Sequence, residues 1–446
     1  MTAEHASFAA ARAAFAAGGD TPRSYLERSL ERIAACEKQV RAFVTLNIEG
    51  ARAAADAATR RWAEGRPLSL VDGMPIGVKD LIHTADMPTE MNSPIFKGWR
   101  SGRDAASVWW LRRSGAVILG KTVTTEFGVG ASGPTTNPHD PARTPGGSSS
   151  GSAAAVAAGM VPVALGTQSM GSIIRPSSYC GVFGFKPSFG ALNRGGIHGL
   201  IPSQAFLGTH AAGLQDLWET AAVIAGTAGG DAGHPGLPGG LDLPGARRPK
   251  RLLVLRTRAW QGCSADMRAA FEAQLDALRA QDIELLLSER DSAARTFEDD
   301  FADWISVFMD IVCWEMRWPM AMYAEDGAEL IGERASGFLR HGMAMRPADY
   351  VRALARRQAY RDAYAAFADR MDAVVMPSTV GPAPIGLGFT GPPDFNAVSS
   401  GLAVPAISMP MMQVEGLPVG VQLMGFLGRD DDLAAVARRV WEARQP

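Results

Sequence analysis

The sequence predicts an α/β fold, because short apolar runs alternate along it with segments of helical periodicity. The alanine-rich run Ser152 to Ala158 is typical of a tightly packed helix that ends at Gly159, and Val161 to Leu165 follows it as a buried strand. The same order occurs earlier, where a helical run over Ala106 to Ser114 precedes a strand-like run over Ala116 to Leu119. Two helix–strand units of this kind are the basis of the prediction.

The composition is that of an ordinary globular protein. The chain has 446 residues, of which 47% are hydrophobic and 20% charged. This length is often divided among two or three domains, although large α/β enzymes also fold as one unit. The formal net charge of −2 argues against general affinity for nucleic acid or for an anionic membrane.

Cysteine use and the N-terminal residues predict a soluble cytoplasmic protein. The four cysteines form no Cys-x-x-Cys pair and no metal-ligand spacing, which favours a reducing compartment and predicts no bound metal. Glu4 and Arg12 interrupt the features that a signal peptide requires. No apolar stretch approaches the roughly 20 residues that span a bilayer.

The first half of the chain contains one further helix and one further extended run. Thr21-Pro22 predicts a helix start, since a capping hydroxyl is followed by proline at the first helical position, and Ser24 to Glu37 continues with helical spacing. Val71 to Val78 is an apolar, extended run that leads directly to Lys79. We therefore expect a strand that carries this lysine into the interior.

The second half begins with a loop and then becomes mostly helical. Gly226 to Pro249 is rich in glycine and proline and predicts a surface loop or linker. A buried strand is expected at Arg251 to Leu255 and an amphipathic helix at Ala265 to Ala280. Phe297 to Arg370 is predicted to be mostly helical.

Two loops rich in glycine and serine flank the alanine-rich helix and its strand. They are Pro145 to Ser152 and Gly166 to Ser172. Glycine there costs stability, and serine hydroxyls are poor core material, so the composition indicates chemistry rather than packing. The two loops are expected to face each other across a cleft.

These loops and several further segments resemble the amidase signature family of serine hydrolases. The matching segments are VDGMPIGVKDL (Val71 to Leu81), VILGKTVTTEF (Val117 to Phe127), NPHDPARTPGGSS (Asn137 to Ser149), the stretch Pro145 to Ser188, DAVVMPSTVGPAPIG (Asp372 to Gly386) and GLPVGVQLMG (Gly416 to Gly425). Together these motifs are highly specific. The resemblance implies a large mixed β-sheet core covered by helices on both faces.

The resemblance also implies a single amidase domain over residues 1–446. Within it we expect an N-terminal helical segment (about 1–65), a catalytic core (about 66–225), a variable helical region that shapes the substrate pocket (about 260–370) and C-terminal core strands (about 371–446). A homodimer is one option for its oligomeric state.

The resemblance implies a catalytic triad without histidine. Ser172 is the expected nucleophile, and Lys79 is the expected base, acting through Ser148 as a hydroxyl bridge. The family usually has a cis peptide before the bridging serine, here between Gly147 and Ser148. Burial would lower the pKa of Lys79 and leave its amine neutral, as a base must be. All seven histidines lie outside the two loops, which fits a base of another kind.

Consecutive backbone N–H groups in the second loop are expected to form the oxyanion hole. These are the groups of Ser169, Met170, Gly171 and Ser172. The chain departs from the family at Gln168, where aspartate is usual, and at Met170, where glycine is usual and a side chain restricts the backbone. Ser203 to Leu207 likewise replaces a usual serine–aspartate turn. These departures indicate an atypical branch.

The predicted function is hydrolysis of a small-molecule carboxamide through a serine acyl-enzyme, with no cofactor. The candidates for lining an apolar substrate pocket are Gln168, Phe206, Trp304 and Trp314. Arg175 is expected to act as a structural clamp, with orientation of the substrate as the alternative. Asp80 is expected to hold the backbone around Lys79, and Cys180 to pack as a small apolar residue.

Two alternatives to this function stay open, and two others are rejected. The first alternative lies within the family and is the A-type component of a glutamine-dependent amidotransferase. The second is of another class and is a catalytically impaired binding protein on the same fold. An α/β-hydrolase elbow at Gly147-x-Ser149-x-Gly151 is rejected, because the preceding segment is no strand. A nucleotide-binding loop is rejected as well, because the first loop lacks the required lysine.

Overall fold

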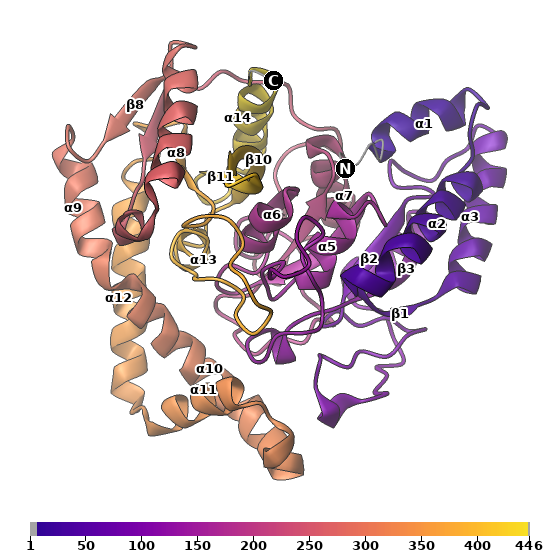
Figure 1. Cartoon of the computed structure of the whole chain (residues 1–446), viewed down its shortest axis with the longest axis horizontal. Helices are drawn as coiled ribbons and strands as arrows, with labels where there is room; N and C mark the ends of the chain where they lie inside the picture. The colour runs from indigo at the N-terminus through magenta and orange to yellow at the C-terminus, as the bar shows by residue number, and fades with distance from the viewer. Residues whose placement is uncertain (1–6, 445–446) are drawn as a thin grey trace.

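The computed structural model describes residues 7–444, and its centre is one mixed β-sheet (Figure 1). Across the sheet the strands follow the order β1-β3-β2-β4-β6-β5-β10-β11-β9-β7-β8. β2 pairs in parallel with β3 and β4, and β7 pairs in parallel with β8 and β9, while the remaining pairs are antiparallel. The strands are β1 Phe43–Leu46, β2 Pro75–Lys79, β3 Val117–Thr122, β4 Val163–Gln168, β5 Phe183–Lys186, β6 Phe206–Ala211, β7 Arg251–Val254, β8 Glu284–Leu287, β9 Ala373–Pro377, β10 Ala406–Val414 and β11 Leu417–Met424.

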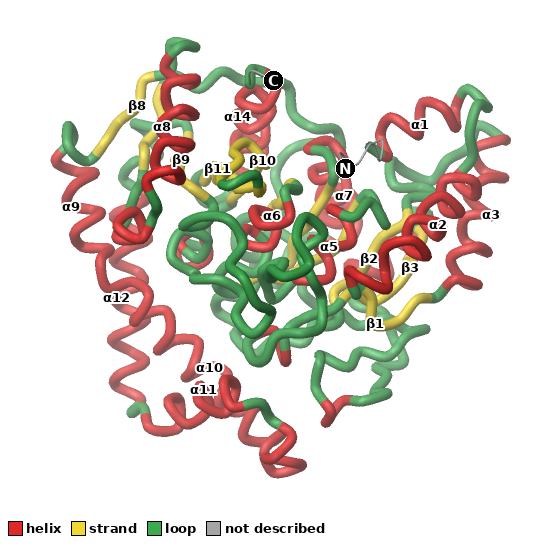
Figure 2. The backbone as a smooth tube through the Cα atoms, viewed as in Figure 1, coloured by secondary structure: helices red, strands yellow, loops and turns green. Residues whose placement is uncertain are grey.

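Helices cover the sheet, and long loops lie over its central part (Figure 2). The helices are α1 Phe8–Ala16, α2 Pro22–Val40, α3 Ile48–Ala63, α4 Ala106–Arg113, α5 Ser150–Ala157, α6 Ile174–Cys180, α7 Leu214–Ala228, α8 Ala265–Arg279, α9 Ser292–Asp300, α10 Trp304–Gly327, α11 Glu333–Ala344, α12 Pro347–Ala365, α13 Val398–Gly401 and α14 Asp430–Glu442. Within residues 7–444, none of them combines the length and apolar character that a membrane crossing requires.

Strand β5 shows how both faces of the sheet are covered. Successive side chains of a strand point to opposite faces. Phe183 packs on Trp441 of α14 and Phe185 on Trp218 of α7, whereas a side chain at Gly184 would meet Ser177 of α6 at 2.2 Å. Helices α7 and α14 therefore cover one face and α6 the other, as the predicted α/β fold class requires.

Most of the predicted elements are confirmed with shifted boundaries. Helix α2 begins at Pro22, where the side chain of Thr21 accepts a hydrogen bond from the Ser24 N–H. Helix α5 starts two residues before the predicted Ser152 and ends one residue before Ala158. Strand β4 runs to Gln168, three residues beyond the predicted end, because β6 continues to pair with it there.

The prediction of an extended run from Val71 was wrong at its first residues. Residues 71–73 form a turn, and β2 begins only at Pro75. Gly73 has a φ of +89°, a left-handed conformation that favours glycine. The buried carboxylate of Asp72 accepts from Arg61 and from the Leu68 N–H, and it holds the turn in place. The strand therefore ends at Lys79 as predicted but is shorter.

The helical stretch expected over Phe297 to Arg370 is confirmed as parts of α9, α10, α11 and α12 with short connections. In Figure 1 these helices form an arm that extends away from the sheet, and α10 packs against both α11 and α12. The loop predicted over Gly226 to Pro249 begins after α7 ends at Ala228. Its physical basis is the density of glycine and proline, which disfavours regular structure.

Candidate active site

Lys79 is buried at the end of β2 and has three hydrogen-bond acceptors. Its side chain is 0% exposed. Its Nζ donates to Ser148 Oγ at 2.7 Å, to Thr167 Oγ1 at 2.8 Å and to the Thr167 carbonyl at 3.2 Å. Burial lowers the pKa of Lys79 well below its ordinary value of 10.5. Burial therefore favours the neutral amine, which is the form that can accept a proton.

Lys121 is a second buried lysine near the site, and unlike Lys79 it has a carboxylate partner. Its Nζ lies 3.0 Å from Asp80 Oδ1 and also donates to Thr89 Oγ1. The other Asp80 oxygen accepts from the N–H groups of Glu90 and Met91. Asp80 therefore holds the backbone at Glu90 and Met91, whereas the sequence predicted that it holds the backbone around Lys79. Lys79 forms no ion pair within the described part of the chain.

Ser148 lies in the first loop, one residue before Ser149, the N-cap of α5. The peptide bond between Gly147 and Ser148 is cis, as the family resemblance implied. The next serine ties this loop to β4, since Ser149 Oγ donates to the Thr167 carbonyl at 3.1 Å and accepts from the Thr167 N–H at 3.3 Å. The Ser149 N–H also donates to the Ser172 carbonyl at 3.3 Å. The two glycine–serine loops are thus joined at the backbone.

Gln168 anchors the second loop from inside the protein. Its Oε1 accepts from the N–H groups of Ile173 at 2.7 Å and Ile174 at 3.1 Å, and its Nε2 donates to Ser400 Oγ at 2.9 Å. The side chain is 1% exposed, and it is not among the residues that line the cavities beside Ser148. The amide that replaces the family's usual aspartate therefore supplies an acceptor to two backbone groups.

We expect Gln168→Leu to destabilise the fold by about 2 to 4 kcal/mol, because two buried N–H groups lose their acceptor. Chemical denaturation would measure the change in the free energy of unfolding. The matched control is Gln358→Leu, whose side chain is exposed on α12 and which should shift stability by less than about 0.5 kcal/mol. Equal stability of the two variants would contradict this role for Gln168.

In the last part of the second loop, the carbonyl groups of Ser169, Met170 and Gly171 are bonded, whereas the N–H groups of residues 169–172 are free. The carbonyl of Ser169 accepts from Gln204, that of Met170 from Ser400 Oγ, and that of Gly171 from the Arg175 N–H. The N–H groups of residues 169–172 have no acceptor within residues 7–444. Because a peptide group is planar, each bonded carbonyl directs the following N–H the other way. Such a row of N–H groups can bind an oxyanion.

Met170 does not strain this loop. It is absent from the non-glycine residues with positive φ in the described chain, so its side chain is compatible with the backbone that the loop adopts. Gly171 is the position where a side chain cannot be accommodated. A Cβ there would lie 1.6 Å from Asn396 Oδ1, and Asn396 is itself buried and donates to the Pro392 carbonyl. Close approach of Asn396 therefore explains this glycine.

We expect Gly171→Ala to slow the reaction of Ser172 about 100-fold, because the clash with Asn396 must displace the loop. The rate of Ser172 labelling by a fluorophosphonate would measure the effect. Adding Asn396→Ala removes the clashing atoms and should recover part of the rate. Gly262→Ala, at a glycine with open space around it, is the control and should label at the wild-type rate.

Two cavities meet at Ser148, Ser169 and the Gly128–Val129 turn. The smaller, of about 100 Å³, contains Ser172 and Met170, with Arg175 and Phe338 among its other lining residues. The larger, of about 320 Å³, contains Thr167 and the predicted pocket residue Phe206. Apolar side chains line both walls together with hydroxyl and charged groups, which include Arg175 and Arg334 in the smaller cavity. The arrangement can hold an apolar substrate against the two serines.

The two predicted pocket tryptophans lie elsewhere. Trp304 is 4% exposed and packs in the core on Phe301, with ring centroids 5.4 Å apart. Trp314 is half-buried and stacks on Tyr350 at 5.2 Å. Neither lines the cavities beside Ser148. Both rings fill contacts between helices, which aromatic composition alone cannot distinguish from a pocket wall.

Several lining residues were not found from the sequence. Thr167, the second hydroxyl partner of Lys79, lies in the second glycine–serine loop of the sequence, but nothing there distinguished it as a partner of the lysine. The pairing of β4 with β2 brings it to that position. For Arg175, a clamp was the expected role and substrate orientation the alternative; it donates to the carbonyls of Gly147 and Gly391 and also lines the smaller cavity. No local signal in the sequence predicted the contribution of Phe338, which lies far along the chain.

The histidine and cysteine residues nearest the site are poor alternatives as base or nucleophile. Burial lowers the pKa of His210 to about 3 and that of His198 to about 4. Burial raises the pKa of the Cys180 thiol, which agrees with its predicted role as a packed apolar residue. Neutral histidines of such low basicity would accept a proton weakly.

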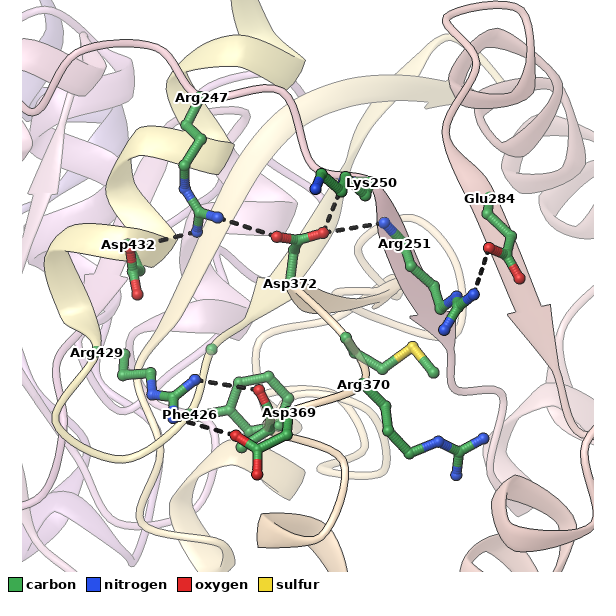
Figure 3. A pocket seen from close by; sticks show the side chains of 13 residues that line it. Arg247, Lys250, Arg251, Glu284, Asp369, Arg370, Asp372, Phe426, Arg429 and Asp432 are labelled. Carbon is green, nitrogen blue, oxygen red and sulfur yellow. Dashed lines mark hydrogen bonds and ion pairs between the residues drawn. The ribbon is translucent and has the colours of Figure 1, made fainter.

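A separate hollow lies on the far part of the sheet, beside β7, β9 and α14 (Figure 3). Figure 3 shows charged side chains that pair with one another, including Arg247 with Asp372 at 2.9 Å and Arg251 with Glu284 at 2.7 Å. This hollow contains none of Lys79, Ser148 and Ser172. It is a surface network of ion pairs and contributes nothing to the site described above.

Comparison with known proteins identifies the family. The Amidase family profile matches residues 24–433. The A-type component of glutamyl-tRNA(Gln) amidotransferase from Roseiflexus sp. (strain RS-1) is 32% identical over 98% of this chain and 97% of its own length. The same component from Chloroflexus aurantiacus (strain ATCC 29366 / DSM 635 / J-10-fl) is 44% identical, but that match covers 50% of this chain and about half (47%) of the relative.

A similar solved structure has the same fold. The crystal structure of an amidase, 29% identical in sequence, superposes with a TM-score of 0.84 and covers 98% of this chain and 99% of its own. A profile match over most of the chain, a relative of 32% identity along nearly its whole length, and this superposition agree with one another. The chain belongs to the amidase signature family of hydrolases.

Proposed function

We propose that this protein hydrolyses a carboxamide through an acyl-enzyme on Ser172. The observation that carries the proposal is the buried Lys79 amine, which lacks an ion pair in the described residues and donates to Ser148 Oγ at 2.7 Å. A buried neutral amine beside a serine hydroxyl is suited to proton transfer. The free N–H groups of residues 169–172 supply the oxyanion donors that acyl transfer needs.

The proposed reaction proceeds in two halves. Ser172 Oγ attacks the amide carbon and gives its proton to Ser148 Oγ, which passes its own proton to Lys79 Nζ. The C–N bond of the tetrahedral intermediate then breaks, and the amine leaves with the proton returned through Ser148. Water attacks the Ser172 ester in the second half, with the same pair of residues accepting and returning the proton.

The two cavities support an apolar amide as the substrate class. Their walls carry side chains such as Phe127, Ile201 and Phe206 in the larger cavity, and Val312 and Phe338 in the smaller. Burying apolar groups of the substrate against such walls is favourable at roughly 25 cal/mol per Å². Anilides with an alkyl or aryl acyl group are suitable first substrates, and their release of an aromatic amine is easily measured.

A second candidate is the A-type component of a glutamine-dependent amidotransferase. It is favoured by the similarity to such a component along almost the whole chain. Ammonia release from glutamine, together with partner chains that co-purify, would support this function. Turnover of anilides with no glutaminase activity would support the independent amidase.

Exposure of the wild-type chain to a fluorophosphonate, followed by intact-mass spectrometry, tests the proposed chemistry. One adduct, mapped to Ser172, is the expected result. An unmodified protein that also hydrolyses no amide would contradict the proposal, and it would favour the catalytically impaired binding protein. That measurement needs no knowledge of the natural substrate.

A further inference from the structure

Gln204 is a buried residue outside the second loop whose side chain contacts that loop at Ser169. It lies in the turn before β6 and is 0% exposed. Its Nε2 donates to the Ser169 carbonyl at 3.1 Å, and its Oε1 accepts from Arg357 Nη1 at 3.4 Å. Arginine can only donate, and a carbonyl can only accept. The two neighbours therefore determine which way the amide of Gln204 points.

The turn that carries Gln204 is held by two helices of the arm. Ser203 Oγ accepts from Arg357 Nη1 at 2.9 Å and donates to Glu315, while the Ser203 N–H donates to Glu315 Oε2 at 2.9 Å. Tyr350 OH also donates to Glu315, at 2.9 Å. Glu315 belongs to α10, and Tyr350 and Arg357 belong to α12. The hydroxyl of Ser203 thus joins a carboxylate and a guanidinium beside the loop.

The contact on the Ser169 carbonyl has a geometric consequence for Met170. The Ser169 C=O and the Met170 N–H belong to one planar peptide group and point in opposite directions. A donor that holds the carbonyl therefore determines the direction of the N–H. That N–H has no acceptor in the described chain and belongs to the row of free groups.

We infer that Gln204 is a positioning residue for the oxyanion hole, and that Arg357 and the Ser203–Glu315 contact hold it in place from α10 and α12. This inference rests on the proposed function. Through the hydrogen bond from Gln204 Nε2 to the Ser169 carbonyl, the helical arm determines the direction of the Met170 N–H. The turn Ser203 to Leu207, which departs from the family pattern, then has a specific task in this chain.

Two variants separate the hydrogen bond from simple packing. Gln204→Leu keeps the size of the side chain but removes the donor. Gln204→Glu also keeps the shape and can still accept from Arg357, yet an ionised carboxylate cannot donate to the Ser169 carbonyl. Both should slow the labelling of Ser172 by a fluorophosphonate about 10- to 100-fold, somewhat less than removal of an oxyanion donor itself. With an anilide substrate, kcat should fall and KM should change little.

Arg357→Met tests the connection to the helical arm. It should slow labelling less than Gln204→Leu, and the double variant should be no slower than Gln204→Leu alone, because both changes act on one contact. Arg352→Met is the matched control, since Arg352 is an exposed arginine of the same helix that pairs with Asp349. It should label at the wild-type rate.

Each other outcome has a definite meaning. Wild-type labelling rates in Gln204→Leu or Gln204→Glu would overturn this inference and leave the proposed function intact. A rise in KM at constant kcat would also overturn it, since the role would then lie in substrate binding. A wild-type chain that is neither labelled nor active would contradict the proposed function and this inference with it.

Discussion

Ser172→Ala is expected to abolish amide hydrolysis, with kcat lower by about 10⁴-fold or more. The substitution removes the oxygen that forms the ester, and the residual rate would come only from substrate binding and the oxyanion donors. The side chain is 6% exposed and lines the smaller cavity, so its loss should leave the fold unchanged. Steady-state turnover of an anilide and the loss of the fluorophosphonate adduct would measure the effect.

Ser107→Ala is the matched control for this experiment. Ser107 is also buried, and its hydroxyl has no hydrogen-bond partner within residues 7–444, but it lies on α4 away from both cavities. It should react and turn over like the wild type. Full activity of Ser172→Ala, or an adduct that persists in it, would mean that another residue is the nucleophile.

Lys79→Met is expected to lower kcat by about 10³-fold or more, because Ser148 then has no amine to receive its proton. Burial of the methionine side chain is favourable, so the thermal unfolding temperature should not fall strongly. Labelling of Ser172 should become correspondingly slow. Wild-type kinetics in this variant would contradict the role of Lys79 as base.

The pH dependence provides a second readout for Lys79. The base must be neutral, so kcat/KM of the wild type should rise with pH through the lowered pKa of Lys79 and then level off. Stability should also rise with pH above that lowered pKa and up to roughly 10.4, since the unfolded chain binds a proton there that the folded chain does not. Lys79→Met should remove this limb of the rate profile and this contribution to stability.

Lys121→Met is the informative comparison. It removes the partner of the buried Asp80 carboxylate and should destabilise the fold by about 3 to 5 kcal/mol. The loss of activity should follow the loss of folded protein, and the pH limb assigned to Lys79 should remain in the folded fraction. Loss of activity and of the pH limb in Lys79→Met, against loss of stability in Lys121→Met, would distinguish a catalytic base from a structural ion pair.

Local patterns predicted the elements that carry the site. Proline after Thr21, alanine over Ser152 to Ala158 and the apolar run before Lys79 depend on interactions within a few residues, and the structure confirms the helices and the end of the strand. The observed boundaries differ from the predicted ones where pairing with a neighbouring strand sets the end of an element. Strand β4 continues to Gln168 because β6 pairs with it, and no local pattern contains that partner.

The motifs and their spacing were enough to infer the function in outline. They were not enough to predict which side chains line the site. Trp304 and Trp314 have the composition expected of a pocket wall, yet they pack between helices. Conversely, Phe338 carries no local signal, and Thr167 was not distinguished from its neighbours in the second loop, yet both line the site. Aromatic or hydroxyl character describes what a side chain can do, and only the packing of distant segments determines where it does so.

Short patterns in the chain were enough to predict the α/β class and the family resemblance, and the resemblance in turn implied the candidates Lys79, Ser148 and Ser172. Three further features could be seen only in the folded protein. Lys79 is buried without an ion pair in the described chain, Gln168 anchors the second loop, and Gln204 reaches Ser169. Burial, and hydrogen bonds between distant residues such as Gln168 with Ser400 and Gln204 with Ser169, arise only when the fold brings separate segments together.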